Sequence, residues 1–176
     1  MRSLQDSNMT DKPLRYLLPD DIGTLELLPA VLAHFETHKQ LKWSAKEAGG
    51  QLFACLEDPF CIRIVEGTGP RSTDKRSTYN YLPDRAAEKV EIKERFDRGL
   101  HFVGDWHTHK QKLPQPSDTD TRSIRELVRH SNHDLAGFVL IVVGQAPFPN
   151  GLTVSFHTKS GSTTLRLESH DDLELL

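Results

Sequence analysis

GDWHTH at residues 104–109 and PSDTD at residues 116–120 carry most of the structural and chemical information in this chain. The first stretch is typical of a strand end and the second of a helix start. His107 and His109 are two positions apart, so on a strand both imidazoles point to the same side. Asp120 lies in the first helical turn, where a return loop can bring its carboxylate to the same point. Two imidazoles and a carboxylate are a usual catalytic zinc set, so the spacing predicts a zinc site.

Each half of this pattern also has a purely structural explanation. An isolated H-x-H pair is common and carries little information by itself. Ser117-x-x-Asp120 matches a capping box, in which Ser117 caps the helix and Asp120 is its third residue. Taken alone, that tetrapeptide supports capping at least as well as catalysis. The joint spacing favours the metal, and the two roles are compatible because a capped helix start would hold Asp120 in place.

The composition argues against several classes of protein. The chain has 176 residues, enough for one domain, with a net charge of −3 and a pI near 6.3. A nucleic-acid binder usually has a basic stripe or a high pI. The longest apolar run, residues 135–143, is about half as long as a membrane span. The first residues contain no apolar secretion-signal segment. We therefore expect a cytoplasmic protein that binds neither nucleic acid nor a membrane.

Around the histidine segment, the pattern of apolar residues and turn signals predicts an alternation of strands and helices. Residues 1–12 are polar and are expected to form a flexible tail, with a single domain over 13–176. We expect Val90, Ile92 and Phe96 to point partly inward from one of the helices. The predicted strands are 14–18, 24–27, 51–56, 60–65, 100–106, 135–143, 152–158 and 163–168; the predicted helices are 29–40, 85–98 and 118–130, and a loop covers 67–84.

This order of elements predicts an α/β or α+β sandwich, a mixed sheet with helices packed against it. Residues 135–143 are nearly all apolar, as expected of a central strand covered on both faces. Cys55 and Cys61 flank a turn-like Glu-Asp-Pro segment and are expected on adjacent strands, reduced and engaged in packing.

The stretch from Glu47 to Asp120 resembles the JAMM (JAB1/MPN+) metallopeptidases, whose pattern is a glutamate, then H-[ST]-H, seven residues, and S-x-x-D. The resemblance implies the MPN/JAB fold, which is similar to that of cytidine deaminases, and one zinc ion per chain. Glu47 before Gly49-Gly50 resembles the upstream glutamate of the family, although from the residues alone it could be a solvated turn residue, and Glu57 and Glu66 lie nearby. Lys110 departs from the family, in which many members have proline at this position.

This resemblance also implies a mechanism. Glu47 would take a proton from the attacking water and pass it to the leaving amine, and the Ser117 hydroxyl would donate to the oxyanion. The substrate would be a peptide or isopeptide bond after a flexible C-terminal tail. Such a tail can dock as an added strand, and the 67–84 loop could form one wall of its groove.

A closer resemblance is to a bacterial stand-alone subgroup, seen in Gly69-Pro70-Arg71, in Leu82-Pro83-Asp84 and in the segment 104–109. Its members include the deconjugating peptidases of CBASS (cyclic-oligonucleotide-based antiphage signalling) operons. The implied partner is a CD-NTase, a cGAS-like nucleotidyltransferase, conjugated through its C-terminus. A ubiquitin-like protein of another bacterial pathway is the alternative.

Two further alternatives come from other features. His34 and His38 in HFETH are spaced like a zincin pair, but Glu36 is at the third position of the motif instead of the second. On a helix this glutamate points away from the shared face, so a surface helix is the better interpretation.

A catalytically inactive MPN-type scaffold is the rival function. Such domains usually lose one or more ligands, and this chain retains all of them.

Overall fold

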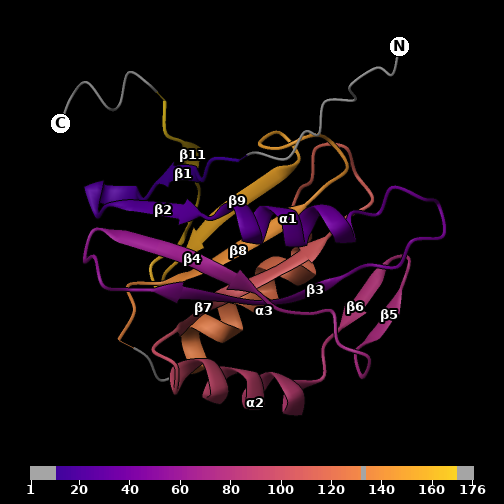
Figure 1. Ribbon diagram of the computed structural model, residues 1–176, viewed down its shortest axis with the longest axis horizontal. Coiled ribbons are helices and arrows are strands. Elements are labelled where there is room, and N and C mark those ends of the chain that lie inside the picture. Colours follow the sequence, from indigo (N-terminus) through magenta and orange to yellow (C-terminus); the bar gives the residue numbers. More distant parts are fainter. Residues whose placement is uncertain (1–10, 132–133, 170–176) are drawn as a thin grey trace.

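The computed structural model describes residues 11–131 and 134–169, so most of the expected N-terminal tail lies outside the described residues. Within these residues, fourteen helices and strands follow one another, with a short 3-10 turn at Pro19–Asp21. Figure 1 shows their arrangement around one large sheet. In chain order they are β1 (Leu14–Leu17), β2 (Thr24–Leu27), α1 (Pro29–His38), β3 (Gly49–Cys55), β4 (Cys61–Gly67), β5 (Lys75–Ser77), β6 (Asn80–Leu82), α2 (Arg85–Phe96), β7 (His101–Thr108), α3 (Asp118–His130), β8 (Phe138–Val143), β9 (Leu152–His157), β10 (Ser162–Thr164) and β11 (Arg166–Leu167).

The large sheet has nine strands in the order β10-β9-β8-β7-β3-β4-β2-β1-β11. The pairs β2·β4 and β7·β8 are parallel and the others antiparallel, which makes the sheet mixed, as predicted. The segment 162–167 supplies both edge strands: β10 pairs with β9 and β11 pairs with β1. The strand expected over 163–168 is thus divided at Leu165, whose buried side chain joins the main core.

β8 is the central strand that the apolar run predicted. All six of its residues are buried. Val139, Ile141 and Val143 join the core cluster that includes α1, whereas Phe138, Leu140 and Val142 pack in a second cluster with α3. Because successive side chains of a strand alternate between faces, α1 and α3 lie on opposite faces of β8 (Figure 1). The prediction of a strand covered on both faces is confirmed.

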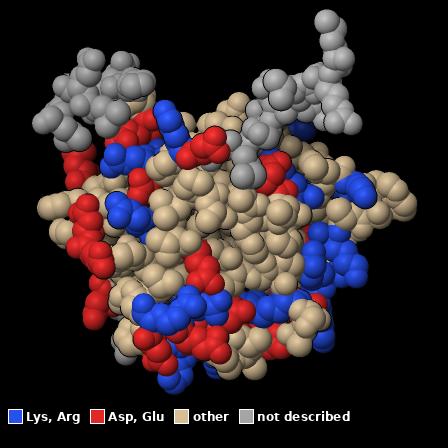
Figure 2. Space-filling view, viewed as in Figure 1, with Lys and Arg blue, Asp and Glu red and all other residues tan. Residues whose placement is uncertain are grey.

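α2 differs from the prediction at Val90 and Phe96, which do not point inward, whereas Ile92 is partly buried, as expected. Val90 and Phe96 are 57% and 63% exposed, and the one buried residue of the helix is Glu88. Ion pairs hold α2 instead: Arg95 Nη2 lies 2.7 Å from Glu66 Oε1 on β4, and Glu91 pairs with Arg71. Figure 2 shows the acidic and basic side chains interleaved over α2, at the bottom of the view.

The segment 67–84 was expected to be a loop, but it contains the hairpin β5–β6, which forms a separate two-stranded sheet. Each of these strands is three residues long, too short for a clear periodic pattern.

Cys55 and Cys61 lie on the adjacent strands β3 and β4 as free thiols. Within the described residues, the helices are too short or too polar to cross a membrane.

Candidate metal centre

The two histidines lie at the carboxyl end of β7. This strand pairs with β3 on one side, with Gly49 opposite His107, and with β8 on the other, with Val142 beside His107. His109 follows the strand, and its backbone N–H donates to the carbonyl of Val143 at 2.8 Å. Pairing on both sides fixes the backbone, so the alternation of the strand directs both rings to one side, as the spacing predicted.

Asp120 is held at the start of α3 by the capping box. Ser117 Oγ accepts from the backbone N–H of Asp120 at 3.2 Å, and Asp120 Oδ2 accepts from the backbone N–H of Ser117 at 2.7 Å. The Ser117 hydroxyl also donates to Asp120 Oδ2 at 2.7 Å. The structural role and the metal-site role of Asp120 are therefore compatible, because the capping hydrogen bonds fix its carboxylate where it faces the rings of His107 and His109.

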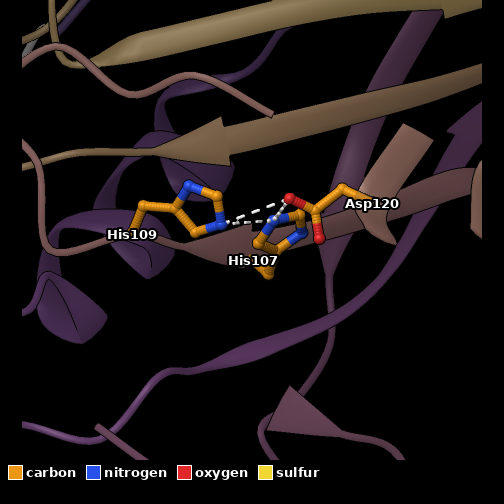
Figure 3. Close-up of side chains that lie close together, drawn as sticks. All are labelled: His107, His109 and Asp120. Carbon is orange, nitrogen blue, oxygen red and sulfur yellow. Dashed lines mark hydrogen bonds and ion pairs between the residues drawn. The ribbon is translucent and has the colours of Figure 1, made fainter. Parts of the chain in front are cut away.

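Three ligand atoms from different parts of the chain converge on one point (Figure 3). His107 Nε2 and His109 Nε2 are 3.2 Å apart, and Asp120 Oδ2 lies 3.2 and 3.3 Å from them. Bonds of 2.0–2.1 Å to one tetrahedral ion place neighbouring ligand atoms about 3.3 Å apart. The spacing of the three atoms therefore fits a tetrahedral zinc ion with one position left for water or substrate.

The electrostatics of this cluster favour an ionised carboxylate. Burial disfavours the charged form of Asp120, but hydrogen bonds with the rings of His107 and His109 outweigh it and hold the pKa of this carboxyl well below its usual range. Burial likewise lowers the pKa of His109, but Asp120 more than compensates and raises it. An ionised carboxylate suits a divalent cation, and metal binding would require both imidazole rings to be neutral.

All five residues that the sequence singled out line one cavity of about 520 Å³: Glu47, His107, His109, Ser117 and Asp120. Glu47 lies just before β3 and is half-buried. Burial raises the pKa of its carboxyl, Asp120 adds to this, and His107 and His109 oppose it. The two nearby glutamates lie elsewhere, since Glu57 is exposed in the β3–β4 turn and Glu66 pairs with Arg95 and Arg98.

Gln40 is a buried residue that sequence reasoning missed. Its side-chain Nε2 donates to the carbonyls of Ala45 and Thr78, at 3.1 and 3.0 Å. Its Oε1 accepts from Thr108 Oγ1 at 3.1 Å, and the same hydroxyl accepts from Ala48 N at 2.9 Å. One amide thus joins the segment around Glu47, the β5–β6 hairpin and the residue between the two histidines. A polar residue just after α1 gave no sequence signal for this role.

The hairpin also holds the backbone of Glu47 directly. Arg76 Nε donates to the Glu47 carbonyl at 2.5 Å, and the Glu47 N–H donates to the carbonyl of Ser77 at 2.8 Å. Both polar backbone groups of this residue are therefore bonded to β5, so the position of Glu47 depends on the hairpin.

Away from the histidines, the cavity wall carries a charged group that the sequence did not reveal. Asp105, two positions before His107 on β7, lines it together with Glu88 and Arg85 of α2. Burial raises the pKa of Asp105 to about 7, and Glu88 adds to this. Among the described residues, its Oδ1 is buried without a hydrogen-bond partner.

In the part of the chain that the structure describes, no third metal-ligating side chain lies beside the zincin-like pair on α1. His38 Nδ1 lies 2.8 Å from the backbone carbonyl of His34, and both rings pack near Trp106. Among the described residues, the one group of three metal-ligating side chains is that of His107, His109 and Asp120. The prediction that HFETH belongs to a helix is confirmed, and its histidine rings take part in packing.

Comparison with known proteins agrees with this geometry. The family described as prokaryotic homologs of the JAB domain matches residues 30–156, which include all five site residues. The chain is 29% identical over 108 residues to a CD-NTase/cGAS isopeptidase of Enterobacter hormaechei, a match that covers 61% of this chain and 60% of the relative. It is 30% identical over 92 residues to a protein of Sinorhizobium fredii named a probable metalloprotease, covering 50% and 56%.

The chain therefore spans less than two thirds of the length of these two relatives. A CD-NTase/cGAS isopeptidase of Pseudomonas aeruginosa is 26% identical over 129 residues, with 72% of this chain and 80% of the relative covered. Among solved structures, protein DSY2949 of Desulfitobacterium hafniense is similar with a TM-score of 0.53 and 16% identity, over 75% of this chain and 82% of that one. At this identity the likeness concerns the fold alone.

Proposed function

The chain belongs to the family of prokaryotic JAB-domain homologs, and we propose that it is a zinc-dependent peptidase or isopeptidase of the JAMM type. The observation that carries the proposal is the convergence of His107, His109 and Asp120 at the spacing of a tetrahedral site, in the cavity that Glu47 also lines. A zinc ion held there would supply a Lewis acid and would lower the pKa of a bound water to about 7.

In this proposal Glu47 is the general base. Its carboxylate would take the proton from the attacking water and later deliver it to the leaving amine. A raised pKa suits this role, because a catalytic group works best when its pKa lies near the operating pH. Partial burial of the Glu47 side chain in the cavity wall is the main cause of this raised pKa.

Ser117 is proposed to donate to the oxyanion of the tetrahedral intermediate. Its hydroxyl proton points to Asp120 Oδ2. Donation to substrate therefore requires the hydroxyl to rotate, which leaves the backbone bond from Ser117 N to Asp120 Oδ2 to hold the carboxylate.

The substrate is proposed to be a protein conjugated through a flexible C-terminal tail. Asn80 and Tyr81 of β6 and the exposed Tyr79 line the cavity, so an extended tail can lie along the hairpin as an added strand. The relatives named CD-NTase/cGAS isopeptidases support a CD-NTase as the conjugated protein and an antiphage CBASS operon as the setting.

This proposal is tested with two fusion proteins, a CD-NTase and a bacterial ubiquitin-like protein, each joined through its C-terminus to a fluorescent protein. The zinc-loaded chain is expected to cut the CD-NTase fusion directly after the last CD-NTase residue, as mapped by intact mass spectrometry. Removing the metal with a chelator should stop the cut, and restoring zinc should recover it, because the cluster offers no other electrophile. Cutting of the ubiquitin-like fusion alone would assign the chain to another pathway. If the zinc-loaded chain cuts neither fusion, the inactive scaffold is the better interpretation.

Replacing Gln40 with alanine is expected to lower kcat by about 10- to 100-fold while the zinc content stays unchanged. Misplacing a catalytic group by about 1 Å can cost 10²-fold in rate, and the Gln40 amide ties the Glu47 segment to Thr108. The unfolding free energy should fall by about 1–3 kcal/mol, because buried carbonyls lose their donor. Steady-state kinetics and metal analysis measure these effects.

Gln145→Ala is the matched control, because among the described residues its side chain donates to the backbone carbonyl of Gln40 and not to the side-chain network around Glu47. This variant should keep kcat within about twofold, since no catalytic group is displaced. Equal losses of kcat in the two variants would mean that Gln40 acts through general stability instead of positioning.

A further inference from the structure

We infer that the C-terminal half of α3, together with the β9–β10 turn, forms a second binding site, one for a phosphate-class oxyanion. The site is a pocket of about 240 Å³ whose wall includes Arg125, Arg129, His157, Lys159, Ser160 and Ser162. Asp120, at the other end of the same helix, belongs to the metal centre. The two pockets share no lining residue, so the inference does not depend on the proposed peptidase activity.

The charges of this pocket are of one sign, although the chain as a whole is acidic, with 25 Asp and Glu against 22 Lys and Arg. Among the described residues, its wall contains three cations and no carboxylate. Anion binding is favoured where positive charges surround a hollow, because the surrounding protein excludes part of the water that would screen these charges.

The two arginines of the pocket also differ from most other arginines in the described part of the molecule. Most described arginines pair with a carboxylate, whereas Arg125, Arg129 and Lys159 form no ion pair within residues 11–131 and 134–169. The helix dipole explains only one of the two arginines, because a cation stabilises a helix mainly in its last turn, where Arg129 lies and Arg125 does not. The paired arginines are Arg15, Arg63, Arg71, Arg85, Arg95 and Arg98.

The geometry of the pocket suits a compact ligand with several acceptor oxygens. Arg125 and Arg129 are four residues apart and so lie on the same face of the helix, with Cβ atoms about 5–6 Å apart. Lys159 and Ser160 line the same pocket from a turn that is closed by the bond from Thr158 N to Gly161 O, at 2.8 Å, and Ser162 lines it from the start of β10. The Ser160 hydroxyl lies 2.8 Å from Thr158 Oγ1. Guanidinium groups bind phosphate oxygens in a bidentate way, and a lysine adds a point charge.

The described part of the pocket wall offers little aromatic surface to a ligand. Among the described residues, no phenylalanine, tyrosine or tryptophan ring lines the pocket, so a nucleobase would have no stacking partner. His157 at the back is buried and fixed, with its Nε2 2.8 Å from Ser155 Oγ. The shared chemistry is therefore that of a phosphate group, which could be free or part of a nucleic-acid backbone.

The test measures binding of inorganic phosphate and of a short single-stranded oligonucleotide to the full chain by calorimetry. We compare the wild type, the double variant R125A/R129A and the control Arg122→Ala, which removes an exposed cation of the same helix outside the pocket. Phosphate should bind the wild type saturably and the double variant at least about tenfold more weakly, because two charge-assisted contacts are lost, with less than about twofold change in the control. Circular dichroism verifies that the variants fold.

The outcomes separate the two sources of phosphate. Binding of inorganic phosphate alone supports a small phosphate ligand, whereas oligonucleotide binding that phosphate competes away supports a nucleic-acid backbone at the same pocket. If phosphate does not saturate the wild type, or if it binds the double variant as well as the control, the inferred site is wrong. None of these results bears on the metal centre.

Discussion

His109→Ala is expected to abolish metal binding and, with it, all peptidase activity. The wild type should carry about one zinc ion per chain, and the variant almost none, because two remaining ligands cannot complete a site that needs three protein ligands. His109 Nε2 lies 3.2 Å from His107 Nε2 and 3.3 Å from Asp120 Oδ2, so its loss opens one side of the cluster. Mass spectrometry of the native protein counts the bound zinc.

Thermal unfolding gives a second readout, which needs no substrate. A ligand at 100 times its Kd stabilises the folded state by about 2.7 kcal/mol. For a domain of this size, this corresponds to a rise of about 5–10 °C in Tm. Zinc should therefore raise the Tm of the wild type but not that of His109→Ala.

The matched control for this experiment is His130→Ala. His130 is an exposed histidine at the end of α3 that pairs with Glu126, away from the metal cluster. This variant should retain its zinc and its zinc-dependent rise in Tm. A folded wild type that stays free of metal after zinc is supplied would rule out the zinc peptidase and leave the scaffold interpretation.

Glu47→Gln is expected to keep zinc and stability but to lose turnover by about 10²- to 10⁴-fold, the usual contribution of a general base. The amide has nearly the shape of the carboxylate, so the backbone bonds of residue 47 to Arg76 and Ser77 should persist. Glutamine cannot accept the proton of the attacking water. Single-turnover kinetics on the cleaved fusion protein, together with zinc analysis, measures both effects.

Glu57→Gln provides the same chemical change at an exposed position on the β3–β4 turn. Its turnover should equal that of the wild type. Retained turnover in Glu47→Gln would reject Glu47 as the base and would direct attention to Asp105, another titratable carboxylate on the cavity wall.

The sequence alone identified the elements whose chemistry is local. The interval of two between His107 and His109 places both rings on one side of a strand, and Ser117-x-x-Asp120 defines a helix cap; both features follow from backbone periodicity within a few residues. α3 begins and ends at the predicted residues, and the apolar run around β8 correctly indicated a strand buried on both faces.

Tertiary structure alone decided the rest, because those features depend on pairing between distant segments. Glu47 lines the same cavity as the histidines because β3 pairs with β7 with Gly49 opposite His107, a register that no local pattern specifies. Gln40 becomes the link to Thr108 only when the chain after α1 folds against the hairpin. α2 turns a charged face inward because its side chains form ion pairs there with Arg71 and Glu66. The sequence of the helix alone would predict that its apolar residues are buried.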